Sequence, residues 1–106
     1  MIHRYESSNP VVVIPGIVRR TLAEGDLMMI CEFTLEKGVK LPIHSHPHEQ
    51  IGYIASGRIR LTVDRESFDL EPGDCYSASS NVPHGAMALE RSVVVDTFSP
   101  PREDYR

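Results

Sequence analysis

The sequence predicts an all-β protein, either a small antiparallel sandwich or a barrel. Most apolar segments alternate with polar residues at a period of two, which is typical of strands. Turn signals separate these segments, at Glu24-Gly25-Asp26, Glu36-Lys37-Gly38, Ser56-Gly57 and Leu70–Asp74. No stretch has helical periodicity long enough to predict a helix. Many short strands joined by turns are typical of closed or double-sheet architectures, which also protect the sheet edges.

Four segments carry the strand pattern most clearly, at residues 11–14, 27–35, 59–63 and 93–98. The first is a β-branched run that Pro15-Gly16 ends. In the second, every odd position from Leu27 to Leu35 is apolar, which predicts that this face, including Cys31, packs in the core. The third and fourth alternate in the same way.

The length predicts one domain spanning residues 1–106, because a chain of this size supplies a single core. The net charge is −4 and there is no basic cluster, so nucleic acid and anionic membranes gain no general attraction. No apolar run approaches the roughly 20 residues of a membrane helix. The N-terminus lacks a signal-peptide pattern, so we expect a cytoplasmic protein, and two cysteines fit a reducing compartment.

Histidines are concentrated in PIHSHPHEQIGY, residues 42–53. His44 and His46 are two positions apart, so in a strand their side chains share a face and can approach one ion. His48 has the same parity, although Pro47 interrupts the strand. Gln50 and His84 would complete a set of ligands if the fold brings them together. The alternative is a polar surface loop, because H-x-H alone has low specificity.

The order of residues around this cluster resembles the first motif of the cupin superfamily, which here spans residues 38–57. The matching positions are Gly38, His44, His46, Gln50 and Gly57, with Gln50 where the family usually has Glu. Residues 73–88 resemble the second motif through Gly73 and His84. Other residues replace its usual Pro, Gly and Asn, namely Ser79, Asn81 and Ala88. The resemblance implies a cupin-type antiparallel β-barrel, a jelly-roll-like double sheet with a metal inside.

The resemblance further implies that the metal ligands are His44, His46, Gln50 and His84. It implies one divalent transition-metal ion, and mixed N/O ligands suit Zn, Ni, Cu, Mn or Fe. All four ligands are neutral, so the ion keeps its double charge and favours binding and polarising an anion. The neutral set argues against redox chemistry. His48 is then expected beside the site or at its mouth, and His3 in solvent.

The C-terminal stretch VVVDTFSPPREDYR, residues 93–106, is the second informative region. Asp96 shares a strand face with Val94 and Phe98, so it either bonds to a loop or solvent at a sheet edge or has a partner inside the barrel. Inside, it would be a general acid or base. Pro100-Pro101 stiffens the arm that carries Arg102, which would bind a carboxylate at the barrel mouth. The alternative for Arg102 is a surface salt bridge with Glu103 or Asp104.

HSHPHEQIGY together with DTFSPPREDY resembles the small cupins that linearise unsaturated monouronates in pectin and alginate degradation. This resemblance implies Asp96, Phe98 and Arg102 as catalytic residues in an enzyme that opens 4,5-unsaturated monouronates to the linear keto form. Two alternatives remain. One is a cupin oxygenase, lyase or isomerase acting on another small acid, and the other is a non-catalytic module that binds a small anion. A homodimer is also implied, with residues 10–18 supplying an added strand.

Overall fold

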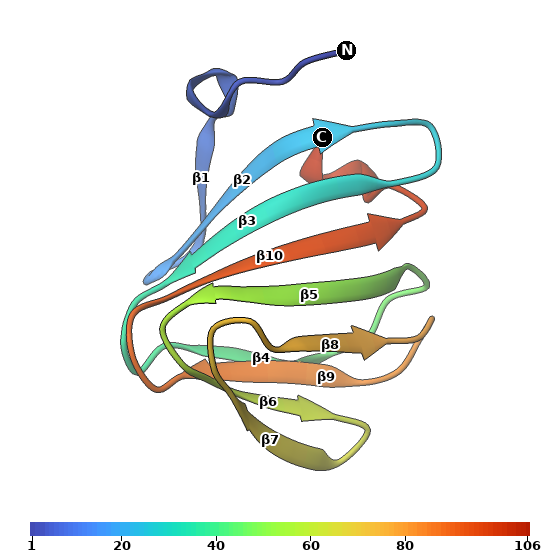
Figure 1. Ribbon diagram of the computed structural model, residues 1–106. Helices are drawn as coiled ribbons and strands as arrows, with labels where there is room; N and C mark the ends of the chain where they lie inside the picture. The colour runs from blue at the N-terminus through green and yellow to red at the C-terminus, as the bar shows by residue number, and fades with distance from the viewer.

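A computed structural model describes residues 1–106 and shows two antiparallel sheets packed face to face (Figure 1). This confirms the predicted all-β fold class. The helical residues are two single 3₁₀ turns, η1 (Tyr5–Ser7) and η2 (Glu103–Tyr105). No helix has the length and apolar character that crossing a membrane requires.

Ten strands build the two sheets. The six-stranded sheet has the order β1 (Pro10–Ile14), β2 (Ile17–Glu24), β3 (Met29–Leu35), β10 (Ser92–Ser99), β5 (Glu49–Ser56) and β8 (Cys75–Ala78). The four-stranded sheet has the order β4 (Lys40–His44), β9 (His84–Ala88), β6 (Ile59–Val63) and β7 (Glu66–Leu70). The last strand, β10, therefore lies in the middle of the larger sheet, between β3 and β5.

The core lies between the sheets and follows from the alternation of buried and exposed residues. β3 and β10 alternate along almost their whole length, and Cys31 is fully buried, as predicted. The buried apolar cluster takes side chains from both sheets, and its members are Ile17, Met29, Cys31, Phe33, Leu35, Ile54, Ile59, Leu61, Ala88, Val94 and Phe98. The buried polar residues are His46, Gln50, His84, Ser92 and Asp96.

The prediction for Leu27 is wrong. The second predicted strand begins at Met29, and Leu27 lies in the preceding turn with 75% of its surface exposed. The backbone N–H of Gly25 donates to the carbonyl of Met28, and this turn takes Leu27 out of the strand. The other three predicted strands are present as β1, β6 and β10.

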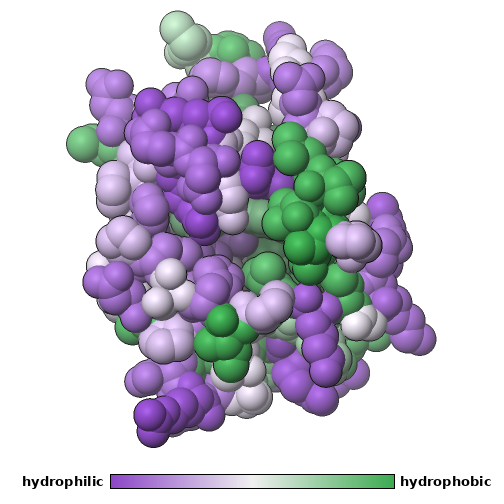
Figure 2. All heavy atoms as spheres, turned by 180° about the vertical axis from the view of Figure 1, so that it is seen from behind, coloured by the Kyte–Doolittle hydropathy of each residue, from purple (hydrophilic) through white to green (hydrophobic).

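The N-terminal segment forms an added strand on its own chain. β1 pairs with β2 through a turn in which Gly16 has φ +93°, a conformation that L side chains rarely adopt. β1 is an edge strand, and Val11 and Val12 are 42% and 68% exposed. Seen from behind, an apolar patch lies over this side of the molecule, next to a hollow (Figure 2).

The two faces of β5 give a direct test of the core. Ile54 is fully buried, whereas Ile51 on the opposite face is 54% exposed. We expect Ile54→Ala to lower the free energy of unfolding by about 2–5 kcal/mol, because it leaves a cavity. Ile51→Ala should change it by about 0.5 kcal/mol or less. Urea denaturation of both variants measures the difference, and equal losses would contradict this packing.

Candidate metal centre

Three imidazoles from two distant parts of the chain lie together at one end of the space between the sheets. The antiparallel pairing of β4 with β9 places His44 directly opposite His84. His46 follows β4 in the loop that leads to β5, and its ring centroid is 4.8 Å from that of His84. One ligand nitrogen of each histidine lies within 4.8 Å of those of the other two. This spacing allows all three to bind one ion after small rotations of the rings.

The hydrogen bonds of these histidines fix which nitrogen faces inward. In each ring Nδ1 contacts a backbone carbonyl, Pro42 for His44 at 2.9 Å, His48 for His46 at 3.0 Å and Val82 for His84 at 2.8 Å. A carbonyl oxygen only accepts, so Nδ1 carries the proton and Nε2 presents a lone pair. Histidines that bind metals through Nε2 are usually held in this way.

The side chain of Gln50 gives the clearest sign that a cation fits here. Its Oε1 lies 3.0 Å from Nε2 of His46, while its Nε2 donates to the hydroxyl of Tyr76 at 2.6 Å. With Nδ1 of His46 protonated, two acceptors face each other, and the other neutral tautomer moves the conflict to the His48 carbonyl. Nε2 of His84 is buried without any partner. A metal ion bound by these atoms would satisfy all of them.

Burial keeps the imidazoles in the form that binds a metal. It lowers the pKa of His46, with the nearby Arg102 and His84 acting in the same direction. It also lowers the pKa of His84, against the effect of the hydrogen bond to Val82. Both rings are therefore neutral at neutral pH, which is the state that coordinates.

Asn81 lies in the loop that precedes β9 and connects this loop to the histidine cluster. Asn81 stands where cupins usually have Gly and has φ +65°, a left-handed conformation that Asn tolerates better than most residues. Its backbone N–H donates to the carbonyl of His46 at 2.8 Å. Asn81 thereby takes over the conformational role of glycine and ties this loop to the histidine cluster.

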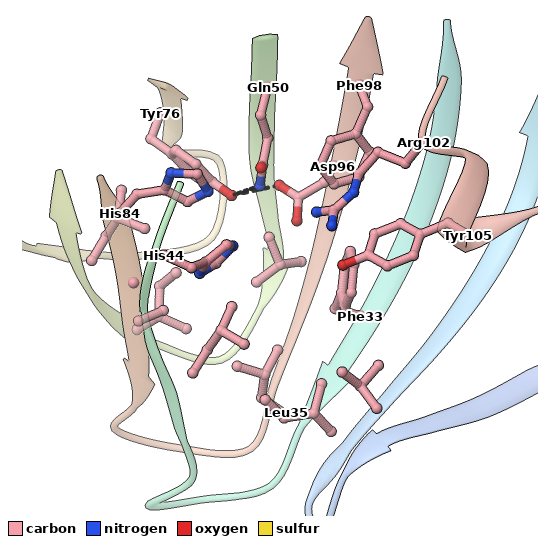
Figure 3. Close-up of a pocket in the computed structure, with 18 residues that line it drawn as sticks. Phe33, Leu35, His44, Gln50, Tyr76, His84, Asp96, Phe98, Arg102 and Tyr105 are labelled. Carbon is pink, nitrogen blue, oxygen red and sulfur yellow. Dashed lines mark hydrogen bonds between the residues drawn. The ribbon is translucent and has the colours of Figure 1, made fainter. Parts of the chain in front are cut away.

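Asp96 points into the barrel, which settles the alternative of an edge-strand aspartate. It lies in the central strand β10, is 5% exposed, and accepts a hydrogen bond from the hydroxyl of Tyr76 at 2.6 Å. Burial raises the pKa of Asp96 to about 6, although the hydrogen bond from Tyr76 opposes the shift. Its carboxylate projects into the same cavity as the side chains of Gln50 and Arg102 (Figure 3).

Arg102 lies at the cavity and also makes an ion pair with Asp104, one of the two partners named in the alternative for this residue. Its Nη2 is 2.9 Å from Oδ2 of Asp104, yet only 13% of its side chain is exposed. Its guanidinium lies 4.1 Å from the ring centroid of Tyr105 and 5.4 Å from that of Phe98. These aromatic contacts hold the cation against the cavity wall. Phe98 is 1% exposed and belongs to both the core and the cavity wall.

The cavity is polar at one end and apolar below, and its volume is about 60 Å³ (Figure 3). The polar end is formed by the side chains of His44, Gln50, Tyr76, His84, Asp96, Arg102 and Tyr105. Valine, leucine and isoleucine side chains from both sheets fill the lower part.

Sequence reasoning missed two residues of this site, Tyr76 and Tyr105. Tyr76 meets Asp96 across the intervening strand β5, a relation that depends on the strand order. Tyr105 lies in a charged C-terminal segment without apolar periodicity. His48 is half-buried, and its backbone carbonyl accepts a hydrogen bond from Nδ1 of His46. Its ring is outside the cluster of three ligand nitrogens. His3 is exposed near the N-terminus, as expected.

Comparison with known proteins agrees with this architecture. Residues 31–95 match the Cupin domain family. The chain is 40% identical over 93 residues to the pectin degradation protein KdgF of Dickeya dadantii, covering 85% of this chain and 84% of that protein. The structure of KdgF from Halomonas sp. superposes with a TM-score of 0.95 at 33% identity, covering 100% of this chain and 98% of that one. An RmlC-like cupin from Shewanella frigidimarina gives a TM-score of 0.93 at 29% identity, covering 97% and 93%. This chain belongs to the cupin family.

Proposed function

We propose that this cupin is a metal-dependent enzyme of pectin degradation that opens the ring of 4,5-unsaturated monouronates to the linear keto form. One observation carries the proposal: the imidazole cluster, a buried carboxylate and a guanidinium all face a single cavity. The similarity to a pectin degradation protein over 85% of the chain supports the choice of substrate. A uronate brings a carboxylate, which suits a site with two cationic elements.

His44, His46, Gln50 and His84 would hold the divalent ion. When bound, the ion supplies Lewis-acid stabilisation for negative charge on the substrate's carboxylate and ring oxygen. Because all four ligands are neutral, none of its double charge is cancelled by the ligands themselves. The proposal names no particular metal, since availability selects among Zn, Ni, Mn and Fe as much as affinity does.

Asp96 moves the proton in this proposal. As a carboxylate it takes the proton from the hydroxyl on C1 of the cyclic substrate while the bond between C1 and the ring oxygen breaks. The electron pair of that bond stays on the ring oxygen, giving an aldehyde at C1 and an enolate at C4–C5. Asp96 then returns the proton to C4, and the enolate becomes the ketone at C5. The reaction is an isomerisation that needs no other reactant, and one positioned carboxylate serves both transfers.

Arg102 would anchor the substrate carboxylate, and Phe98 would form one wall of the pocket. A guanidinium offers paired donors that match the two oxygens of a carboxylate. The ion pair of Arg102 with Asp104 is the contact that would exchange for the substrate carboxylate.

A second candidate is an oxygenase, lyase or isomerase that acts on another small acid at the same centre. It would use the same metal ligands and Arg102 as the ring-opening enzyme. The neutral ligand set favours the ring opening, since anionic ligands stabilise higher oxidation states. Oxygen consumption by the metal-loaded protein would favour an oxygenase. A non-catalytic anion-binding module would bind uronate without converting it.

The proposed homodimer would form at the edge strand β1, where Val11 and Val12 are exposed. An unpaired strand edge with apolar side chains is a ready site for pairing with a second copy. We expect sedimentation equilibrium to give twice the chain mass of 11.9 kDa and Val12→Lys to weaken the association at least tenfold. Leu27→Lys, in an exposed turn at the other end of the sheet, is the control. A monomer at micromolar concentrations would contradict the dimer.

Removal of the metal should abolish activity, because the proposed catalysis requires its charge. Dialysis against a chelator is expected to lower ring opening at least 100-fold, and one equivalent of a divalent ion should restore it. His84→Ala should weaken metal binding in calorimetry, whereas His3→Ala, an exposed residue, should leave both properties unchanged. Full activity in protein shown by elemental analysis to be metal-free would refute the proposal.

Asp96→Asn should keep the fold and the metal but lose turnover. Asparagine has nearly the same shape and still accepts the hydrogen bond from Tyr76, but it cannot take up a proton. We expect kcat to fall by about 10²–10⁴-fold on unsaturated galacturonate, followed by the loss of ultraviolet absorbance of its conjugated double bond. Asp26→Asn, an exposed carboxylate, is the matched control. An Asp96→Asn enzyme with normal kcat would remove the proposed base.

A further inference from the structure

Tyr76, Gly52 and Asp96 form one row across three neighbouring strands. In the larger sheet Asp96 of β10 is paired with Gly52 of β5, and Gly52 is paired with Tyr76 of β8. A side chain on Gly52 would overlap both the ring of Tyr76 and the carboxylate of Asp96. The glycine therefore leaves the space in which the tyrosine crosses the central strand and reaches the aspartate.

The hydroxyl of Tyr76 has only one proton, and the structure shows where it goes. It donates to Oδ1 of Asp96 at 2.6 Å, so toward its other neighbour the phenol oxygen can only accept. That neighbour is Nε2 of Gln50, which donates to it at 2.6 Å. The carboxylate of Asp96 thus sets the direction of both hydrogen bonds in the series Gln50–Tyr76–Asp96.

The orientation of the Gln50 amide depends on this series of hydrogen bonds. A carboxamide has almost the same shape with its oxygen and nitrogen exchanged, but only the oxygen is a good metal ligand. The polar neighbours of the Gln50 side chain are the Tyr76 hydroxyl, Nε2 of His46 and the carboxylate of Asp96, whose pKa the Gln50 side chain lowers. Since the phenol accepts from the NH₂ group, Oε1 is turned toward His46 and the site of the ion.

We propose that Tyr76 is a positioning residue that fixes the amide of Gln50 with its oxygen toward the metal. This inference rests on the metal site of the proposed function and deepens it. It links the proposed base Asp96 to a metal ligand through one hydroxyl. Tyr76 itself need not touch the substrate or the ion to act in this way.

The first test is the Tyr76→Phe variant, which removes one oxygen atom and keeps the ring. Without the acceptor the Gln50 amide can turn over, and we expect the Kd for Zn²⁺, measured by calorimetry, to rise at least tenfold, the usual size for loss of such a partner. Absorption spectra of the Co²⁺-loaded protein should change as well. Tyr53→Phe is the control, because Tyr53 lies on the outer face of β5 and is 47% exposed.

The second test repeats the substitution in a Gln50→Glu background. A glutamate has an oxygen at either position, so its orientation needs no selection. Tyr76→Phe should then change the Kd for Zn²⁺ less than twofold. An equal loss of affinity in both backgrounds would mean that Tyr76 is only structural and would overturn the inference, as would unchanged affinity in the single variant.

A measurement on the unaltered protein keeps the inference testable if Tyr76→Phe does not fold. In NMR spectra of the Zn²⁺-loaded protein, the side-chain NH₂ protons of Gln50 should show nuclear Overhauser effects to the ring of Tyr76. Effects to the ring of His46 instead would overturn the inference. Unaltered protein that binds no metal would refute the proposed function and this inference with it. Normal metal binding in Tyr76→Phe would refute this inference alone.

Discussion

The pairing of β4 with β9 is the constraint on which the site depends. It places His44 opposite His84 although 40 positions separate them, and the turn after β4 brings His46 to the same place. Backbone carbonyls then hold all three Nδ1 atoms, so three lone pairs point toward one another. Such an arrangement is electrostatically unfavourable without a cation. The folding energy of the two sheets holds the ligands in place for one.

Charge in this interior is arranged around that site. The proposed ligands carry no negative charge. Asp96 lies on β10, one strand from Gln50 on β5 and two strands from Tyr76 on β8, and the Tyr76 hydroxyl joins the Asp96 carboxylate to the Gln50 amide. A buried carboxylate costs free energy unless it has hydrogen bonds or a nearby cation. Tyr76 supplies one bond, and Arg102 brings a positive charge to the same cavity. The expected double charge of the ion would add the strongest compensation.

The sequence predicted the fold class and much of the site, for identifiable reasons. β3 and β10 are buried on one face only, so their apolar residues alternate visibly, and motif spacing pointed to four residues that the fold brings together. Leu27 was wrongly predicted to be in the core because the alternation of apolar residues continues past the start of β3 into the preceding turn. β7 is exposed along nearly all its length and β9 reads HGAMA, so neither carries the alternation that reveals a strand. Tyr76 meets Gln50 and Asp96 through the strand order β8–β5–β10, which no local pattern encodes.

The central claim is that His44, His46, Gln50 and His84 bind one ion through three Nε2 atoms and one carboxamide oxygen. Anomalous diffraction from crystals grown with Ni²⁺ or Zn²⁺ tests it most directly. The account predicts a single strong anomalous peak with the three nitrogens at about 2.0–2.1 Å and Oε1 of Gln50 at a similar distance. A peak elsewhere on the molecule, or none at this position at saturating metal, would contradict it.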